Sequence, residues 1–442
     1  MKKIIMTFSF ILIFLGMMTG FTQELPKGKV VLSEIIQEAL RVNPRIHVAE
    51  KEWKAALEKI PQVKALPDPM LRYSRFGQSI ETRLGPQRNK ISLSQKFPFF
   101  GKLALKGEVA RSYSSLLEEE YSAVKADIVL KVKRIFFSLY WFDKALTIAQ
   151  EEKEVLQRLT RIAQKKYETG TANQQDVLKA QLEISKILDK ILTLKQGRKA
   201  LASQLNSLLN KPQDARVGEV EEFQVPEFLA KLSELSKWAI ENRPELKKAR
   251  RLIEKNEKSL KLTKKNYFPD FQLMLDYIDI GGGTTTNPND GQNAWMGSIG
   301  VSIPLWRNKL RAAEAEEAIK LEASRDRYRD MENDTLSRVN ELFFEVKTTE
   351  EQINLYKYSL LPQAEQSFKA SETAYLTGKV DFLNLLESER TILRIKTGYY
   401  KAISDFGKSL AHLDRVVGRE SLMKFEKPNR QNKIEIATLR SQ

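Results

Sequence analysis

The chain reverses direction twice inside long helical patterns, at residues 167–170 (Tyr-Glu-Thr-Gly) and at residues 375–378 (Tyr-Leu-Thr-Gly). The first turn lies in a predicted helical hairpin from about residue 101 to 210, and the second in a hairpin from about 307 to 418. Glycine commonly follows the last residue of a helix, because it adopts a left-handed backbone without strain. Two long hairpins with the same turn predict a duplicated helical unit.

Shorter motifs outside the hairpins recur in the same order. Asn43-Pro44 corresponds to Arg243-Pro244, and Pro67-Asp68 corresponds to Pro269-Asp270. A conserved order with a slowly growing offset is what duplication followed by small loop changes produces. We therefore predict a first structural repeat over residues 24–220 and a second over residues 221–418, with a polar C-terminal tail at 419–442.

The N-terminal segment has the layout of a secretory signal. Lys2 and Lys3 precede an apolar run from Ile4 to Leu15, and small or polar residues follow. This pattern predicts a signal peptide over residues 1–23 and export of the rest of the chain. No later run reaches the roughly 18 apolar residues of a membrane-spanning helix, so no helical anchor is expected after cleavage.

The composition disfavours an enzyme, a metalloprotein and a nucleic-acid-binding protein. The net charge is +16, but the basic residues are scattered among glutamates at helical spacing, which is typical of a solvated surface. The chain has no cysteine, and its two histidines, His47 and His412, are far apart. We expect no catalytic residues, no metal site and no cofactor.

Between the short helix and the long hairpin of each repeat, the hydrophobic pattern changes to a period of two, which predicts strands. In the first repeat the pattern is weaker, with a strand around residues 70–76 and another around 91–97. In the second repeat, residues 281–291 form a Gly-rich loop that we expect to be exposed. One face of the strands is expected to be apolar and would be the lipid-facing side of a sheet in a membrane; its residues are Phe271, Leu273, Leu275, Tyr277, Trp295, Ile299 and Val301.

The helix after each strand pair is unusually long. Apolar residues recur every 3.5 positions, which predicts supercoiled neighbouring helices. At 1.5 Å per residue, an outgoing helix of about 65 residues spans roughly 100 Å and a returning helix of about 40 residues spans roughly 60 Å. The short helix before the strands fills the difference, so each long helix is matched by two shorter ones.

Four strands are too few to close a barrel, and open sheet edges in lipid leave backbone groups unpaired. The chain is therefore expected to oligomerise. A dimer would give eight strands and a lumen filled by side chains, whereas a trimer would give twelve strands and a conduit.

The order of segments, the Pro-Asp entries into the strands and the doubled Tyr-x-x-Gly turns resemble the TolC family of outer-membrane efflux proteins over about residues 30–418. This resemblance implies a mostly α fold with a small membrane β-barrel. It implies a homotrimer with a twelve-stranded barrel in the outer membrane of a Gram-negative bacterium and a long α-helical barrel in the periplasm. It further implies an exit duct that docks a periplasmic adaptor protein and an inner-membrane pump. The implied docking residues are Thr169, Gly170, Thr171, Thr377, Gly378 and Lys379.

The resemblance also implies a gate at the helical tips. In the family, a tyrosine and an arginine of the second turn reach an aspartate that follows the first turn. Tyr375 and Asp176 match the tyrosine and the aspartate, but Val380 occupies the arginine position, with Lys379 beside it. A weaker or differently connected closure is expected.

A family ring of carboxylates that selects cations corresponds to Asn384 and Glu387, so only one of the two acids is present. Glu387 can alternatively be read as a surface acid near Arg390. The sequence around residues 81–86 and 97–102 is similar to the metal-ion branch of the family, but no methionine or histidine ladder accompanies it. A soluble periplasmic coiled-coil scaffold is the alternative function.

Overall fold

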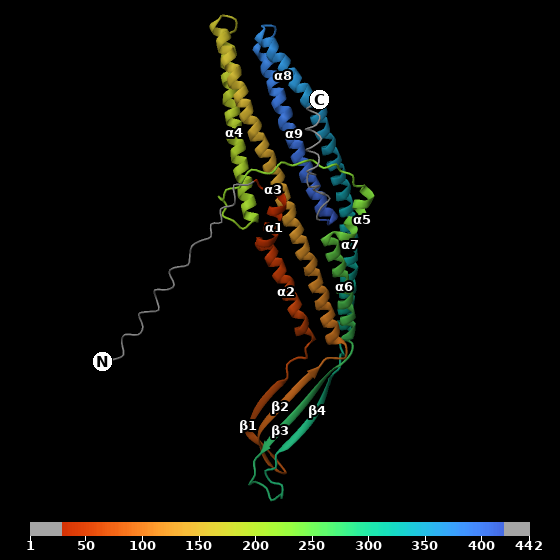
Figure 1. The fold of residues 1–442 in the computed structure, drawn as a ribbon. Helices are drawn as coiled ribbons and strands as arrows, with labels where there is room; N and C mark the ends of the chain where they lie inside the picture. The colour runs from red at the N-terminus through yellow and green to blue at the C-terminus, as the bar shows by residue number, and fades with distance from the viewer. Residues whose placement is uncertain (1–28, 420–442) are drawn as a thin grey trace, which may run out of the picture.

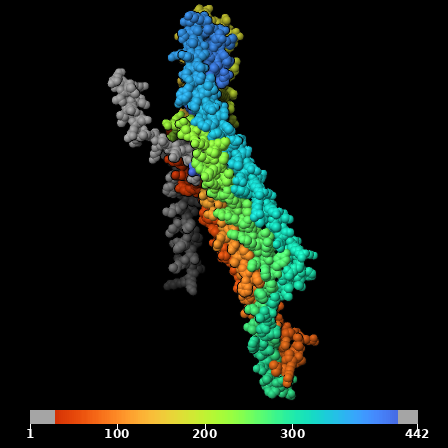
Figure 2. Space-filling model, turned by 90° about the vertical axis from the view of Figure 1, so that its right-hand side faces the viewer, coloured from red at the N-terminus to blue at the C-terminus, as the bar shows by residue number. Residues whose placement is uncertain are grey.

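The computed structural model describes residues 29–419. The predicted signal peptide (residues 1–23) and all of the predicted tail after residue 419 lie outside the described residues. The molecule is long and narrow, with the strands at its lower end and the turns of two helical hairpins at its upper end (Figure 1). Figure 2 shows the same elongated shape after a 90° rotation.

The two halves of the described chain contain the same order of elements. The first half consists of α1 (Leu32–Val42), α2 (Pro44–Lys64), β1 (Met70–Thr82), β2 (Gly85–Phe97), α3 (Lys102–Glu168) and α4 (Gln174–Leu208). The second half consists of α5 (Leu232–Asn242), α6 (Pro244–Lys265), β3 (Asp270–Ile280), β4 (Ala294–Ser302), α7 (Arg307–Leu355), η1 (Tyr356–Leu360), α8 (Leu361–Leu376) and α9 (Phe382–Val417). Among residues 29–419, no helix is both long and apolar enough to cross a membrane.

The four strands form one antiparallel sheet in the order β1-β2-β3-β4, so the two hairpins are joined edge to edge. β1 extends to Thr82, which is longer than the strand predicted around residues 70–76. Its pairing with β2, interrupted only between Arg75 and Ile80, explains the extra length. The outer edges of β1 and β4 are not paired with another described strand.

The main hydrophobic core surrounds the middle of α3, which contacts α1, α2, α4, α6 and α9. Ile128, Val132 and Leu139, which lie on the apolar stripe of α3 that repeats every 3.5 residues, are buried, as are Val339 and Val346 on the matching stripe of α7. Because other helices pack on several sides of α3, burial extends beyond the predicted stripe. Additional large side chains in this core are Phe136, Phe137 and Tyr140.

The second long helix differs from the prediction of one uninterrupted helix. α7 and α8 are separated by η1, a π-helical turn at Tyr356–Leu360, in which the Leu361 amide donates to the Tyr356 carbonyl. Pro362 follows directly and has no amide hydrogen to donate. Its ring would also clash with the carbonyl four residues earlier, and the wider π turn is a known way to accommodate such a break.

A second hydrophobic cluster joins the upper parts of the two hairpins and includes Leu156, Leu159, Ile187, Tyr375 and Phe382. The buried carboxyl group of Glu152 lies on α3 one turn before Leu156. Burial raises the pKa of Glu152 from 4.5 to about 7, although Lys396 and Lys190 oppose the shift.

The folded state consequently binds more protons than the unfolded state between pH 4.5 and about 7, and stability falls as pH rises through this window. Replacing Glu152 with glutamine should remove this loss and raise the thermal midpoint at pH 8. The thermal midpoint is measured by circular dichroism of the detergent-solubilised protein between pH 4.5 and 8. Glu154→Gln, on the exposed side of α3, is the control. Equal pH slopes in Glu152→Gln and the native protein would contradict the assignment.

Candidate functional site

One face of the sheet is apolar and exposed. The register places Phe271 opposite Val301, Leu273 opposite Ile299 and Tyr277 opposite Trp295, so these predicted lipid-facing residues share one face. Leu275, opposite Gly297, continues that face, and Leu93 and Leu71 extend it onto β2 and β1. Trp295 and Ile299 are 77% and 75% exposed. Large apolar patches on a protein surface usually mark a contact with another protein or a membrane.

The opposite face of the sheet is mainly polar. Ser94, Gln272 and Ser298 alternate with the apolar residues along their strands. Lys90 on β2 forms an ion pair with Asp276 on β3 at 2.9 Å, although β2 and β3 come from different repeats. Antiparallel sheets commonly have one apolar and one polar face, and here the apolar face is exposed instead of packed on a core.

The Gly-rich segment between β3 and β4 is largely exposed, as predicted, but it is also hydrogen-bonded internally and to a neighbouring turn. Asp290 accepts hydrogen bonds from the backbone amides of Gly283 and Thr285. Gly281 donates to the Pro86 carbonyl at 2.8 Å, and Gly291 donates to the Leu84 carbonyl at 2.7 Å. The loop is therefore attached to the turn between β1 and β2.

The two helical tips have the same turn geometry. Gly170 and Gly378 have φ angles of 72° and 73°, in the left-handed region. The Thr171 amide donates to the Lys166 carbonyl and the Lys379 amide to the Ala374 carbonyl, each at 2.8 Å. This is the Schellman pattern, which satisfies carbonyl groups at a helix end. The six predicted docking residues thus occupy two equivalent turns, both at the upper end of the molecule (Figure 1).

A shallow groove of about 430 Å³ lies beside the second tip, mainly on the surface of α8. Its lining residues are Lys369, Ala370, Thr373, Ala374, Thr377 and Lys379. Two of them, Thr377 and Lys379, are predicted docking residues. The groove provides a concave surface of small and basic residues next to the exposed turn.

Tyr375, a predicted gate residue, is buried within its own protomer. It is 4% exposed, and its ring lies 5.3 Å from that of Phe382. Its hydroxyl has no hydrogen-bond partner among the described residues. Burial, with a smaller contribution from the Asp176 carboxylate, raises the pKa of Tyr375 to about 12. Tyr375 and Asp176 are therefore brought near each other without a direct hydrogen bond.

A lysine that the sequence did not single out connects the two tips. The Lys166 ammonium, from the first hairpin, donates to the Tyr375 carbonyl at 2.6 Å and lies 4.7 Å from the centre of its ring. Val380, at the position of the family arginine, packs against the second hydrophobic cluster. Lys166 thus supplies a cation next to the tyrosine, but from the other hairpin. No periodicity or motif distinguishes it from the adjacent Lys165.

The two remaining predicted gate residues, Asn384 and Glu387, lie on the exposed side of α9. The Asn384 amide donates to the Asp381 side chain at 2.9 Å, which caps the helix. The Glu387 carboxylate lies 3.7 Å from the Arg390 guanidinium. Arg390 also bonds to Glu183 on α4, which joins the hairpins below the tips. Within residues 29–419, no group of three acids or histidines could hold a metal ion.

Comparison with known sequences gives a consistent result. The chain matches the family described as "Outer membrane efflux protein" over residues 35–211 and 235–419. It is 22% identical over 405 residues to the cobalt-zinc-cadmium resistance protein CzcC of Cupriavidus metallidurans, covering 89% of this chain and 91% of CzcC. It is 19% identical over 403 residues to nodulation protein T of Rhizobium leguminosarum bv. trifolii, covering 88% and 85% of the two chains.

Solved structures show the same fold. CusC, a protein described as forming a transmembrane channel, has a TM-score of 0.75 at 18% identity, covering 88% of this chain and 92% of CusC. The outer membrane protein VceC of Vibrio cholerae has a TM-score of 0.74 at 17% identity, covering 88% and 96% of the two chains.

The contact between the tips can be tested by Lys166→Met, which keeps the aliphatic stem and removes the charged donor. We expect faster amide hydrogen exchange at residues 374–379, because the Tyr375 carbonyl loses its partner from the other hairpin. Lys165→Met, at the adjacent exposed position, should leave exchange unchanged. Identical exchange in both variants would show that Lys166 does not hold the tips together.

Proposed function

Because the chain belongs to the outer membrane efflux protein family, whose members are channels and not enzymes, we propose that it forms a trimeric exit duct in the outer membrane. The observation that carries this proposal is the exposed apolar face of a sheet with two open edges. Such edges need partners in lipid. Pairing β4 of one copy with β1 of the next gives a twelve-stranded barrel when three copies close the ring.

The helical part would extend this conduit into the periplasm. α3 has 67 residues, and at 1.5 Å per residue it is about 100 Å long. Three copies would supply a helical barrel whose upper end carries six Tyr-x-x-Gly turns. We assign these turns, with the groove on α8, to docking of a periplasmic adaptor that connects to an inner-membrane pump.

The gate would lie just inside these tips. Tyr375, Asp176 and Lys166 connect the two hairpins of one copy, and Asn384 and Glu387 are exposed on α9. Three Glu387 carboxylates, one from each copy, would present negative charge to the narrow opening and attract cations. The name of CzcC supports divalent metal ions as the first cargo to test.

Ile299→Lys tests the lipid-facing assignment, because a lysine near the middle of the membrane costs about 2–4 kcal/mol on the lipid side of a barrel. We expect a marked loss of heat-modifiable trimer from the outer-membrane fraction. Ser298→Lys places the same charge on the adjacent, opposite face and should insert normally. Normal insertion of both variants would mean that the apolar face does not contact lipid.

Lys379→Glu combined with Ala370→Trp tests docking by reversing a tip charge and filling the groove. Loss of an interface hot spot costs about 2 kcal/mol, roughly a thirtyfold loss of affinity. Crosslinking to the adaptor in cells and cargo export should both fall, while the trimer remains in the membrane. Lys131→Glu on the exposed side of α3 is the charge control. Unchanged crosslinking would remove the tips from the docking surface.

The gate can be tested with an Asp176→Cys, Tyr375→Cys pair, since the chain has no other cysteine. Oxidation should block conductance in planar bilayers, and reduction should restore it. The two single variants carry the same loss of side chains and should not respond to oxidant. A disulfide-linked channel that still conducts would place the gate elsewhere.

A further inference from the structure

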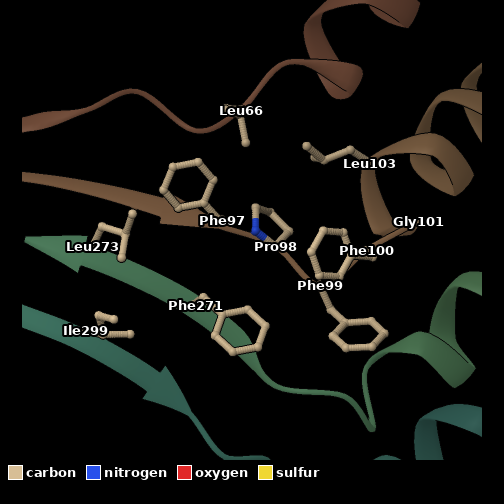
Figure 3. A pocket seen from close by; sticks show the side chains of 10 residues that line it. All are labelled: Leu66, Phe97, Pro98, Phe99, Phe100, Gly101, Leu103, Phe271, Leu273 and Ile299. Atoms are coloured by element: carbon tan, nitrogen blue, oxygen red, sulfur yellow. The ribbon is translucent and has the colours of Figure 1, made fainter.

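A second apolar feature lies where the sheet meets the helices. A cavity of about 490 Å³ opens there, within the size range of pockets that hold small ligands. Its lining residues are Leu66, Phe97, Pro98, Phe99, Phe100, Gly101, Leu103, Phe271, Leu273 and Ile299. Figure 3 shows that they come from three strands, the segment before β1, the segment between β2 and α3, and the start of α3.

The cavity continues the apolar face of the sheet. Phe271, Leu273 and Ile299 belong to both surfaces, so a chain lying on the sheet could pass into the cavity without crossing a polar barrier. Phe100, at the helical end, is 82% exposed. Aromatic side chains are common at the membrane interface, between the hydrocarbon core and the lipid headgroups, and the exposed ring of Phe100 fits that position.

The wall of the cavity is held in place by partly buried polar contacts. The Asp270 carboxylate accepts from the Phe99 amide at 2.9 Å and from the Lys102 ammonium at 2.7 Å. Gly101 has a φ of 84°, which allows the sharp turn from strand to helix. The turn that presents Phe100 is therefore fixed by the fold and is not a mobile loop tip.

A cation lies at the helical end of the cavity, where the Lys265 ammonium is 5.6 Å from the centre of the Phe99 ring. An added Cβ at Gly101 would lie 4.0 Å from Lys265 Cε, so the Lys265 side chain reaches the cavity rim. Its ammonium lies 5.4 Å from the centre of the Phe268 ring. Arg307 and Lys309 are exposed on the first turn of α7, and the Arg307 guanidinium lies 5.7 Å from the centre of the Tyr267 ring, which follows α6.

These three cations make no direct ion pair with an acid in the described part of the chain, although Glu314 bonds to Tyr267, on whose ring Arg307 lies. Within the described residues, Lys265, Arg307 and Lys309 form no ion pair, whereas Lys96 and Lys102 share Asp270. Residues 305–312 contain basic side chains and no acid. An apolar cavity with unpaired cations at one end is complementary to an acyl chain that carries an anionic headgroup.

We propose that this cavity binds an anionic glycerophospholipid of the leaflet nearest the helices, with an acyl chain among Phe97, Phe100 and Leu273 and the phosphate near Lys265 and Arg307. The proposal rests on the proposed membrane insertion of the sheet. It adds a ligand and a headgroup preference that insertion alone does not require, because an apolar face by itself would accept any phospholipid.

The test uses the full-length protein in vesicles that contain phosphatidylglycerol or phosphatidylcholine with brominated acyl chains, which quench tryptophan. Trp295→Phe leaves Trp306, next to Arg307, as the tryptophan beside the sheet. We expect the apparent affinity of the site for brominated phosphatidylglycerol to be about fivefold higher than for brominated phosphatidylcholine. This is the effect of one basic residue near an anionic lipid surface. The triple variant Lys265→Gln, Arg307→Gln, Lys309→Gln should abolish this preference.

A matched triple variant, Lys131→Gln, Lys153→Gln, Arg161→Gln, removes the same charge from α3 far from the sheet and should keep the preference. Equal quenching by the two lipids in inserted native protein would overturn the inference and leave the proposed function intact. A preference that persists in the first triple variant would also overturn it. No quenching by either lipid, together with failure to float with vesicles, would instead contradict membrane insertion itself.

Retention of lipid through purification gives a second readout, by mass spectrometry of the detergent-solubilised protein. Phe100→Ser alters the apolar end of the site at an exposed position, so folding should be preserved. Both Phe100→Ser and the first triple variant should retain less phosphatidylglycerol than the native protein. Equal retention in all three would contradict a shared site.

Discussion

The open edges of the sheet constrain everything else in this molecule. β1 and β4 each present backbone N–H and C=O groups that no other described strand pairs, and the same sheet exposes a broad apolar face. Exposure of the apolar face to water is unfavourable. In lipid, the unpaired backbone groups of the strand edges cost free energy. Pairing of the edges between copies in a closed ring satisfies both requirements, since it leaves the apolar face toward lipid and the polar face toward the interior.

The arrangement of the helices is explained by the duplication of the chain. Each strand pair leads into a long hairpin, so closing the proposed ring of strands would also bring the hairpins together around one axis. The contact of Asp270 with Lys102 connects a strand of one repeat to the long helix of the other at this junction. At the far end, Lys166 and the Arg390–Glu183 pair join the hairpins near the tips. The halves are therefore linked where the sheet ends and where the duct would open.

Sequence alone predicted the features that depend on local periodicity. The turns at Gly170 and Gly378, the apolar strand face and the buried heptad positions all follow from the spacing of residues along one element. The family resemblance predicted the fold and is confirmed by the family match. The barrel and the roles of the tip residues stay predictions, because they depend on contacts between copies.

Features that depend on neighbours in space were missed. Phe136, Phe137 and Tyr140 are buried because α3 is surrounded by helices, which a single heptad stripe does not reveal. The sequence around Lys166 does not distinguish it from other surface lysines, because its contact is with the second tip, which is distant in the sequence. Pro362 is a local indication that the helix is irregular near Tyr356–Leu360. The proline does not break the helix there, because a π turn changes the helical pitch slightly instead.

The central claim is that three copies close one ring through β1 and β4. Cysteines introduced at Tyr73 on β1 and Ile299 on β4, joined by a short bifunctional thiol reagent in membranes, measure this directly. Ring closure predicts covalent dimers and trimers and nothing larger, with neither single-cysteine variant producing trimers. A ladder that continues beyond the trimer, or the absence of any crosslinked species, would contradict the account.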